Sequence, residues 1–286
     1  ESRVRAVQGD AVGAVGLARE ALALSAPALA ERPGDREAAL ERLRQQLILA
    51  EALRGVRDGT AERERLLRER ITGFELLAAT DRRPDLTRQN SFDARRSLIR
   101  LLQDSKRFDE VEKLYAEAFD QLAALLQTEP VNRTYRWELA GQRNNFGYYL
   151  TDTAGKPKEG LVEYRSAVEI YQRLATDFKN DRVILTELAR TQNNLGQTYQ
   201  ASNPPRYAEA VACFGEAARD RGADARTSGS VEDFEAIAGA MTNQGVAHGF
   251  AGSVPEGEAT SQRLIERCEE SGRPARQQLA FARRAL

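Results

Sequence analysis

The sequence contains few of the residues from which metal centres, disulfide frameworks and many active sites are built. Two cysteines, Cys213 and Cys268, and a single histidine, His248, are present among 286 residues. Three such side chains, far apart in the chain, cannot form a four-ligand zinc site without carboxylates. Two cysteines are also too few for a disulfide framework. We therefore expect both cysteines to lie half-buried on helices, and we predict no metal or other cofactor.

Catalytic patterns are missing as well. His248 has no serine or cysteine at a spacing typical of a nucleophile and its base, and no glycine-rich phosphate loop occurs. Carboxylate pairs such as Glu269 and Glu270 are typical of solvated helix faces. The sequence therefore predicts a binding protein and not an enzyme.

The chain has no excess of one charge and no long apolar run. Its 42 basic and 43 acidic residues give a formal net charge of −1. Nucleic-acid-binding proteins usually carry a positive excess, because neutralisation of phosphates dominates their affinity. No apolar run approaches the ~20 residues that a membrane helix needs. We therefore expect no nucleic-acid partner and no membrane segment in this chain.

The types of basic residue and the first residue of the chain bear on its source. Nearly all the basic residues are arginine and alanine is abundant, which is typical of GC-rich bacterial genomes. The sequence does not determine the compartment, and the bacterial cytoplasm is the default expectation for such a source. The chain begins at Glu1 without a methionine. This start indicates a fragment of a longer protein.

An internal repeat is the strongest feature that is present. Residues 138–147, 187–196 and 237–245 align without gaps, and their glycines at positions 147, 196 and 245 are 49 residues apart. A second pattern follows each copy, with a small residue, an aromatic residue four positions later and then alanine, as in Gly160, Tyr164 and Ala167. These positions fall on one face of a helix. No alternating strand pattern occurs, so the repeat predicts pairs of helices.

The motifs resemble those of tetratricopeptide repeats. The family pattern Leu-Gly-x2-Tyr followed by Ala-x3-Phe is matched by Leu195, Gly196 and Tyr199, and then by Ala210 and Phe214. The usual repeat has about 34 residues, so we place the extra length in longer helices. Kinesin light chains carry a similar Asn-Asn-Leu signature, and extended repeats of this kind occur fused to bacterial signalling proteins.

This resemblance implies an all-α fold, a right-handed α-solenoid of stacked antiparallel helix pairs. Turn signals rich in proline and glycine separate the predicted helices, and residues 222–230 form the longest predicted loop. The predicted spans are a leading helical segment at 1–34, repeats at 35–82, 83–130, 131–179, 180–229 and 230–272, and the start of a further helix at 273–286.

The candidate binding site is a series of asparagines, one per repeat, on the first helices that line the concave face. Asn145, Asn194 and Asn243 are 49 residues apart. Asparagine offers both a donor and an acceptor, so such a series can hold the backbone of an extended peptide. The same side chains can instead bond within the solenoid, and both interpretations stay open. The remaining candidate residues are Asn144, Asn193, Arg190, Gln197 and Tyr148.

Two further arginines, Arg95 and Arg96, take the place of the asparagine pair in an earlier repeat. They would add positive charge to the inner face and favour an acidic segment, although exposed arginines commonly serve only solubility and surface pairing.

Three functions are compatible with such an array. The first is a protein-interaction scaffold that binds a peptide or partner domain. The second is a regulatory sensor array of a larger signalling enzyme, such as a Ser/Thr kinase or caspase-like protease, with its catalytic domain elsewhere in the same polypeptide. The third is self-association through the ends of the solenoid.

Overall fold

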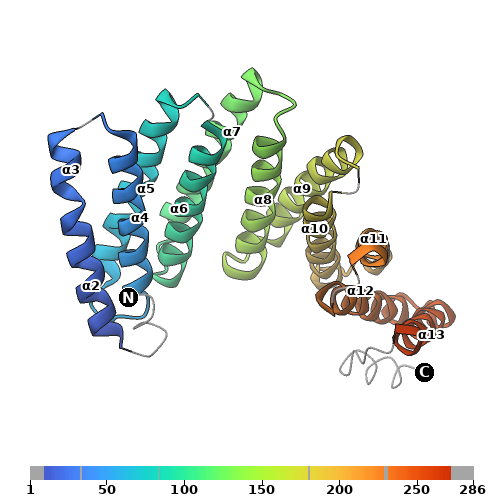
Figure 1. The fold of residues 1–286 in the computed structure, drawn as a ribbon. Coiled ribbons are helices and arrows are strands. Elements are labelled where there is room, and N and C mark those ends of the chain that lie inside the picture. Colours follow the sequence, from blue (N-terminus) through green and yellow to red (C-terminus); the bar gives the residue numbers. More distant parts are fainter. Residues whose placement is uncertain (1–9, 33, 83, 180, 229–230, 272–286) are drawn as a thin grey trace. The chain divides into compact units, whose positions relative to one another are not determined.

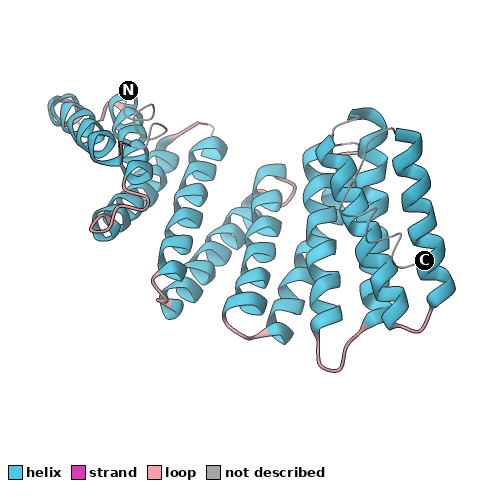
Figure 2. Cartoon of the chain, turned by 90° about the horizontal axis from the view of Figure 1, so that it is seen from below, coloured by secondary structure: helices cyan, strands magenta, loops and turns pink. Residues whose placement is uncertain are grey.

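The computed structural model describes residues 10–32, 34–82, 84–179, 181–228 and 231–271. Every regular element in these residues is helical (Figure 2). Within each of the two units described below, neighbouring helices pack against one another. The fold is therefore an all-α helical solenoid.

The chain divides into two compact units, residues 1–123 and 124–286. Figure 1 labels their helices in chain order. The first unit contains α2 (Ala11–Leu24), α3 (Ala26–Glu31), α4 (Arg36–Ala52), α5 (Thr60–Thr80), α6 (Pro84–Asp104) and most of α7 (Phe108–Thr128). The second contains α8 (Arg133–Tyr148), the π-helical turn η1 (Tyr149–Thr153), α9 (Pro157–Asp177), α10 (Arg182–Ala201), α11 (Tyr207–Ser228), α12 (Val231–Phe250) and α13 (Val254–Ser271). In the first unit α4 packs on α5 and α5 on α6, and in the second α8 to α13 pack in succession.

Short polar side chains fix where several first helices begin. The side chain of Asp35 accepts hydrogen bonds from the first backbone amides of α4, and Asn132 and Asp181 do the same for α8 and α10. Such caps satisfy amides that have no partner inside the helix. Asn132 and Asp181 are 49 residues apart, so the repeat extends to the caps.

Glycines on the first helices make room for aromatic rings of the second helices. A Cβ atom on Gly147 would lie 3.0 Å from Tyr164, and one on Gly196 would lie 2.8 Å from Phe214. Both rings are at most 1% exposed. The repeated glycine therefore lets two helices approach closely, and the aromatic side chain fills the space beside it.

The extra length of each repeat lies in the helices, as the spacing predicted. The helices α9, α10, α11 and α12 have 20 to 22 residues each. The prediction of a long loop at residues 222–230 is wrong, because α11 continues to Ser228. Glycine and polar residues gave the loop signal, but a single glycine lowers helix stability by only about 1 kcal/mol.

One segment of the first unit is long and apolar enough, by length and composition, to cross a membrane. It runs over Ala11–Glu31, that is, over α2 and α3. The expectation that no apolar run approaches this length therefore needs correction. Core helices of soluble proteins, which are mostly buried, and signal sequences near an N-terminus pass the same test. Here 18% of the window is buried, including Ala14, Val15 and Ala18 of α2. A partly exposed ion pair joins Arg19 of α2 to Glu62 of α5.

Both cysteines are buried, more deeply than expected: Cys213 is 9% exposed and Cys268 is 4% exposed. Cys213 belongs to the core cluster of the second unit, together with Tyr164 and Phe214. Burial raises the pKa of the Cys213 thiol to about 11. A thiol with this pKa is not reactive at neutral pH, so this cysteine serves as an apolar core residue.

Candidate functional site

The candidate residues of α10 share one face of that helix. Arg190, Asn194 and Gln197 are spaced by four and three residues, so they form a single stripe. Arg190 and Gln197 are exposed and Asn194 is half-buried. Helix α10, the first helix of its repeat, therefore presents a polar stripe, and the middle residue of that stripe is half-buried.

The asparagines bond to one another across neighbouring repeats. The Nδ2 atom of Asn194 donates to Oδ1 of Asn144 over 3.1 Å, and Nδ2 of Asn243 donates to Oδ1 of Asn193 over the same distance. Each bond therefore joins one asparagine column to the adjacent column in the preceding repeat, a separation of 50 residues. These two bonds tie α10 to α8 and α12 to α10.

The two bonds differ in their exposure to water. Asn144 is 1% exposed, whereas Asn193 is half-buried. Asn144 also donates to Asn145 over a long 3.4 Å. The Asn144–Asn194 bond is therefore a buried link between helices, and the Asn193–Asn243 bond is more accessible.

These bonds leave part of each amide available to a ligand. An asparagine side chain carries two N–H donors and an oxygen with two lone pairs. The contact with Asn193 uses one donor of Asn243, and no hydrogen bond within the described part of the chain uses the Asn243 oxygen. Structural bonding and ligand binding can therefore coexist at the same residue.

A groove lies beside the accessible pair, between α10 and α12. Its volume is ≈ 240 Å³. Its floor includes the alanine cluster formed by Ala189, Ala217 and Ala240. Its other lining residues are Arg190, Asn193, Ala236, Gly239 and Asn243. Five of these eight lining residues are alanine or glycine, so no large side chain fills the groove at those positions. A Cβ atom on Gly239 would have no atom within 4 Å.

The structure thus brings together three of the predicted residues, Arg190, Asn193 and Asn243, around one groove. Sequence reasoning missed the small residues that make the groove. Part of the signal was present, because Ala189 occupies the same repeat position as Ala140, but alanine at such a position is equally typical of close helix packing.

The remaining candidates lie elsewhere on the first helices. Tyr148 is 54% exposed at the end of α8, and the nearby Asp152 carboxylate raises the pKa of its phenol. Gln197 is exposed near the end of α10. Arg190 forms an ion pair with Glu187, one turn earlier on α10. Its charge is therefore partly compensated at the rim of the groove.

The hypothesis that Arg95 adds an exposed charge is wrong. Arg95 is 4% exposed, and its guanidinium donates to Glu75 and to Gln121, each over 2.9 Å. It links α5, α6 and α7 within the first unit. Arg96 keeps some exposure but forms an ion pair with Asp93.

Comparisons with known proteins bear on the fold. No family model matches the chain, and no curated protein matches its sequence. Among solved structures, the chain is similar to the crystal structure of BtubC (BKLC) from P. vanneervenii. The TM-score is 0.59 at 18% sequence identity, and the match covers 90% of this chain and 91% of that one. At this identity the similarity supports the all-helical fold.

Proposed function

We propose that this chain is a protein-interaction module that binds an extended peptide segment in the groove between α10 and α12. The observation that carries the proposal is an alanine-floored groove next to amide groups with unused hydrogen-bonding capacity. An extended peptide presents one N–H and one C=O per residue, and the amides of Asn193 and Asn243 can pair with both. The groove lacks the volume for a large ligand, so a small side chain on the peptide would fit its floor.

We further propose that the solenoid is of the tetratricopeptide type. The packing of Tyr164 against Gly147 and of Phe214 against Gly196 supports this assignment. In such arrays the first helices carry the binding surface, which is where the groove lies. The partner can be a separate protein or, in a regulatory array, another domain of the same polypeptide.

The test fills the groove without disturbing the fold. Gly239 lies within α12, and a side chain there meets no atom within 4 Å. Leucine is a better helix former than glycine by nearly 1 kcal/mol, so Gly239→Leu should fold at least as stably as the wild type. Gly249→Leu is the matched control, because Gly249 is also in α12 with open space and does not line the groove.

Peptides would be selected from a random phage-displayed library on the wild-type chain, and their affinities measured by fluorescence anisotropy. We expect Gly239→Leu to weaken selected peptides at least about tenfold, which corresponds to about 1.4 kcal/mol, and Gly249→Leu to leave affinity unchanged. A library that yields no binder, or binders insensitive to Gly239→Leu, would refute the proposal.

A further inference from the structure

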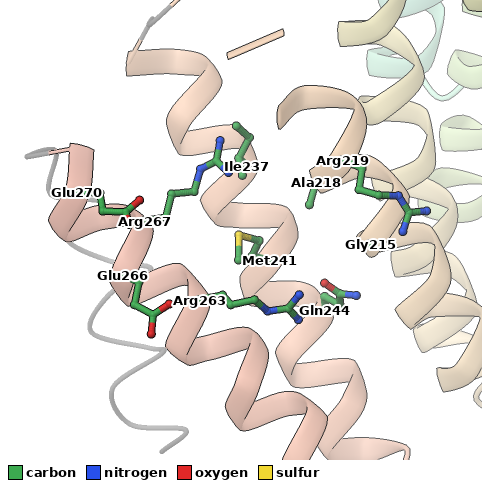
Figure 3. A pocket seen from close by; sticks show the side chains of 10 residues that line it. All are labelled: Gly215, Ala218, Arg219, Ile237, Met241, Gln244, Arg263, Glu266, Arg267 and Glu270. Carbon is green, nitrogen blue, oxygen red and sulfur yellow. The ribbon is translucent and has the colours of Figure 1, made fainter. Parts of the chain in front are cut away.

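A second and larger pocket lies in the same unit, between α11, α12 and α13 (Figure 3). Its volume is ≈ 640 Å³. Ala218, Ile237 and Met241 supply an apolar part of its lining, and Gln244 supplies an amide. The charged residues around it are Arg219, Arg263, Glu266, Arg267 and Glu270. Three guanidinium groups and two carboxylates thus surround an apolar surface.

In the part of α13 that the structure describes, the two arginines do not form ion pairs with the glutamates three positions later. Arg263 and Glu266 have the same order and spacing as Arg107–Glu110 and Arg206–Glu209, which do form ion pairs. In the described residues no ion pair joins Arg263 to Glu266. Instead, Glu266 accepts a hydrogen bond from Gln262 over 3.2 Å.

Arg267 and Glu270 have the same spacing one turn later in α13, and no ion pair joins them in the described residues. Figure 3 shows Arg263 and Arg267 extending from α13 towards Gln244 and Ile237 of α12, with Glu266 and Glu270 staying beside α13. The guanidinium groups of Arg263 and Arg267 therefore reach towards α12, and Glu266 and Glu270 line the pocket closer to α13.

Arg263 is held in this orientation by its own helix. Its Nη2 atom donates to the hydroxyl of Thr260 over 3.0 Å, and its Nε atom donates to the carbonyl of Ala259 over 3.2 Å. Thr260 is fully buried, so it cannot move away. A guanidinium group that is already oriented loses less entropy when it binds an anion.

An amide replaces a hydrophobic residue at the same pocket. Gln244 lies 49 residues after Leu195, a buried core residue. Its side chain has room because residue 215 is glycine: a Cβ atom there would lie 2.7 Å from Nε2 of Gln244. The repeat thus departs from its hydrophobic pattern where the pocket needs a donor and an acceptor.

From these features we propose that the pocket between α11, α12 and α13 binds an acidic peptide segment that carries aliphatic side chains. The arginines of α13 and Arg219 of α11 receive the carboxylates, because guanidinium groups bind carboxylates in charge-assisted hydrogen bonds. Ile237, Met241 and Ala218 receive the aliphatic side chain, and Gln244 bonds the peptide backbone. A chain with net charge −1 has no general affinity for acidic peptides, so this local excess of arginine is what would select one.

This site is separate from the groove between α10 and α12. The groove uses Gly239 and Asn243 of α12, whereas the pocket uses Ile237, Met241 and Gln244 on another face of that helix. A variant that blocks one site should therefore leave the other intact, and either proposal can fail alone.

The experiment uses the whole chain and a fluorescein-labelled peptide, Gly-Gly-Glu-Leu-Asp-Glu-Leu-Asp-Gly-amide, in anisotropy titrations at about 50 mM salt, where surface charges are weakly screened. The test variant is Arg263→Ala/Arg267→Ala. The control is Arg173→Ala/Arg182→Ala, which removes the same charge from exposed positions on α9 and α10. Gly239→Leu is a second control, because it fills the groove between α10 and α12 and leaves the arginines of α13 unchanged.

We expect the test variant to bind the peptide at least about tenfold more weakly, and both controls to bind as the wild type does. A peptide with glutamine and asparagine in place of the acidic residues should not bind. Equal losses in the two arginine variants would overturn the proposal, because bulk charge would then explain binding. Undetectable wild-type binding, or equal binding of the neutral peptide, would overturn it too. The oligomeric state of each variant would also be measured by sedimentation velocity. A dimer that the wild type and both controls form and the test variant does not would overturn the proposal, since a second copy of the chain would then occupy the pocket.

Discussion

Replacing Asn194 by alanine removes the hydrogen bond that ties α10 to α8. The bond ends on Oδ1 of Asn144, a residue that is 1% exposed. Water cannot readily replace the lost donor there, and leaving a buried acceptor unsatisfied costs about 1–3 kcal/mol. Alanine is a better helix former than asparagine by up to roughly 0.7 kcal/mol. Subtracting the helix gain from this cost gives an expected destabilisation of about 0.3–2.3 kcal/mol.

Asn243→Ala is the matched comparison, because it removes a bond of the same length with the same gain in helix propensity. Its acceptor, Asn193, is half-buried, so water can hydrate the freed oxygen. The cost should then approach the net value of an ordinary hydrogen bond, about 0.5–1.5 kcal/mol before the helix gain. Asn194→Ala should therefore destabilise the protein by roughly 1 kcal/mol more than Asn243→Ala.

The assay is urea and thermal unfolding followed by circular dichroism at 222 nm. A difference of 1 kcal/mol corresponds to roughly 2–4 °C in the melting temperature for a unit of this size. A double-mutant cycle with Asn144→Ala then isolates the pair, and we expect a coupling energy of about 0.5–1.5 kcal/mol. Equal costs for Asn194→Ala and Asn243→Ala, together with additive effects of Asn144→Ala and Asn194→Ala, would show that the bond does not link the helices.

Two further predictions concern the packed core. Gly196→Ala should lower stability by about 1 kcal/mol or more in thermal melts, because its Cβ would lie 2.8 Å from the fully buried Phe214 ring and overpacking outweighs the helix gain. Gly239→Ala, with open space, should raise stability by up to about 1 kcal/mol, so equal effects of the two changes would contradict this packing. Burial raises the pKa of Tyr164 to about 12, above the unfolded value of about 10. The folded state therefore holds this proton between pH 10 and pH 12, and stability should fall with rising pH across that interval. In urea melts, the free energy of unfolding of Tyr164→Phe should fall less between pH 10 and pH 12 than that of the wild type. An equal fall in both proteins would refute the raised pKa of Tyr164.

The two proposed binding sites suit different kinds of peptide. The groove between α10 and α12 offers amides and a small floor, which suit a peptide held mainly by its backbone. The pocket between α11, α12 and α13 offers guanidinium groups around apolar side chains, which suit a particular composition. Two such sites on one unit would let a single partner be held at two points, and the affinities would then multiply through effective concentration.

Several features of the fold could be predicted from the sequence because they are local. The 49-residue spacing of the glycines and the capping residues Asn132 and Asp181 mark where helices begin and pair. Helical periodicity then gives the buried face, so the sequence alone was enough to assign Tyr164 and Phe214 to the core. The prediction failed at residues 222–228, where weak local signals for a loop were outweighed and the helix continues.

The sequence by itself determined the class of elements, the repeat and the residues on the first helices, since these follow from short-range spacing along one chain. Only the tertiary structure decided what those residues do. Asn194 donates a hydrogen bond to Asn144, and Asn243 donates one to Asn193, each across 50 residues of the chain. Arg95 is buried against Glu75 and Gln121 and is not displayed on the surface. The physical reason is that a side chain's partner depends on how neighbouring helices pack, and that packing results from the whole core and not from the local sequence.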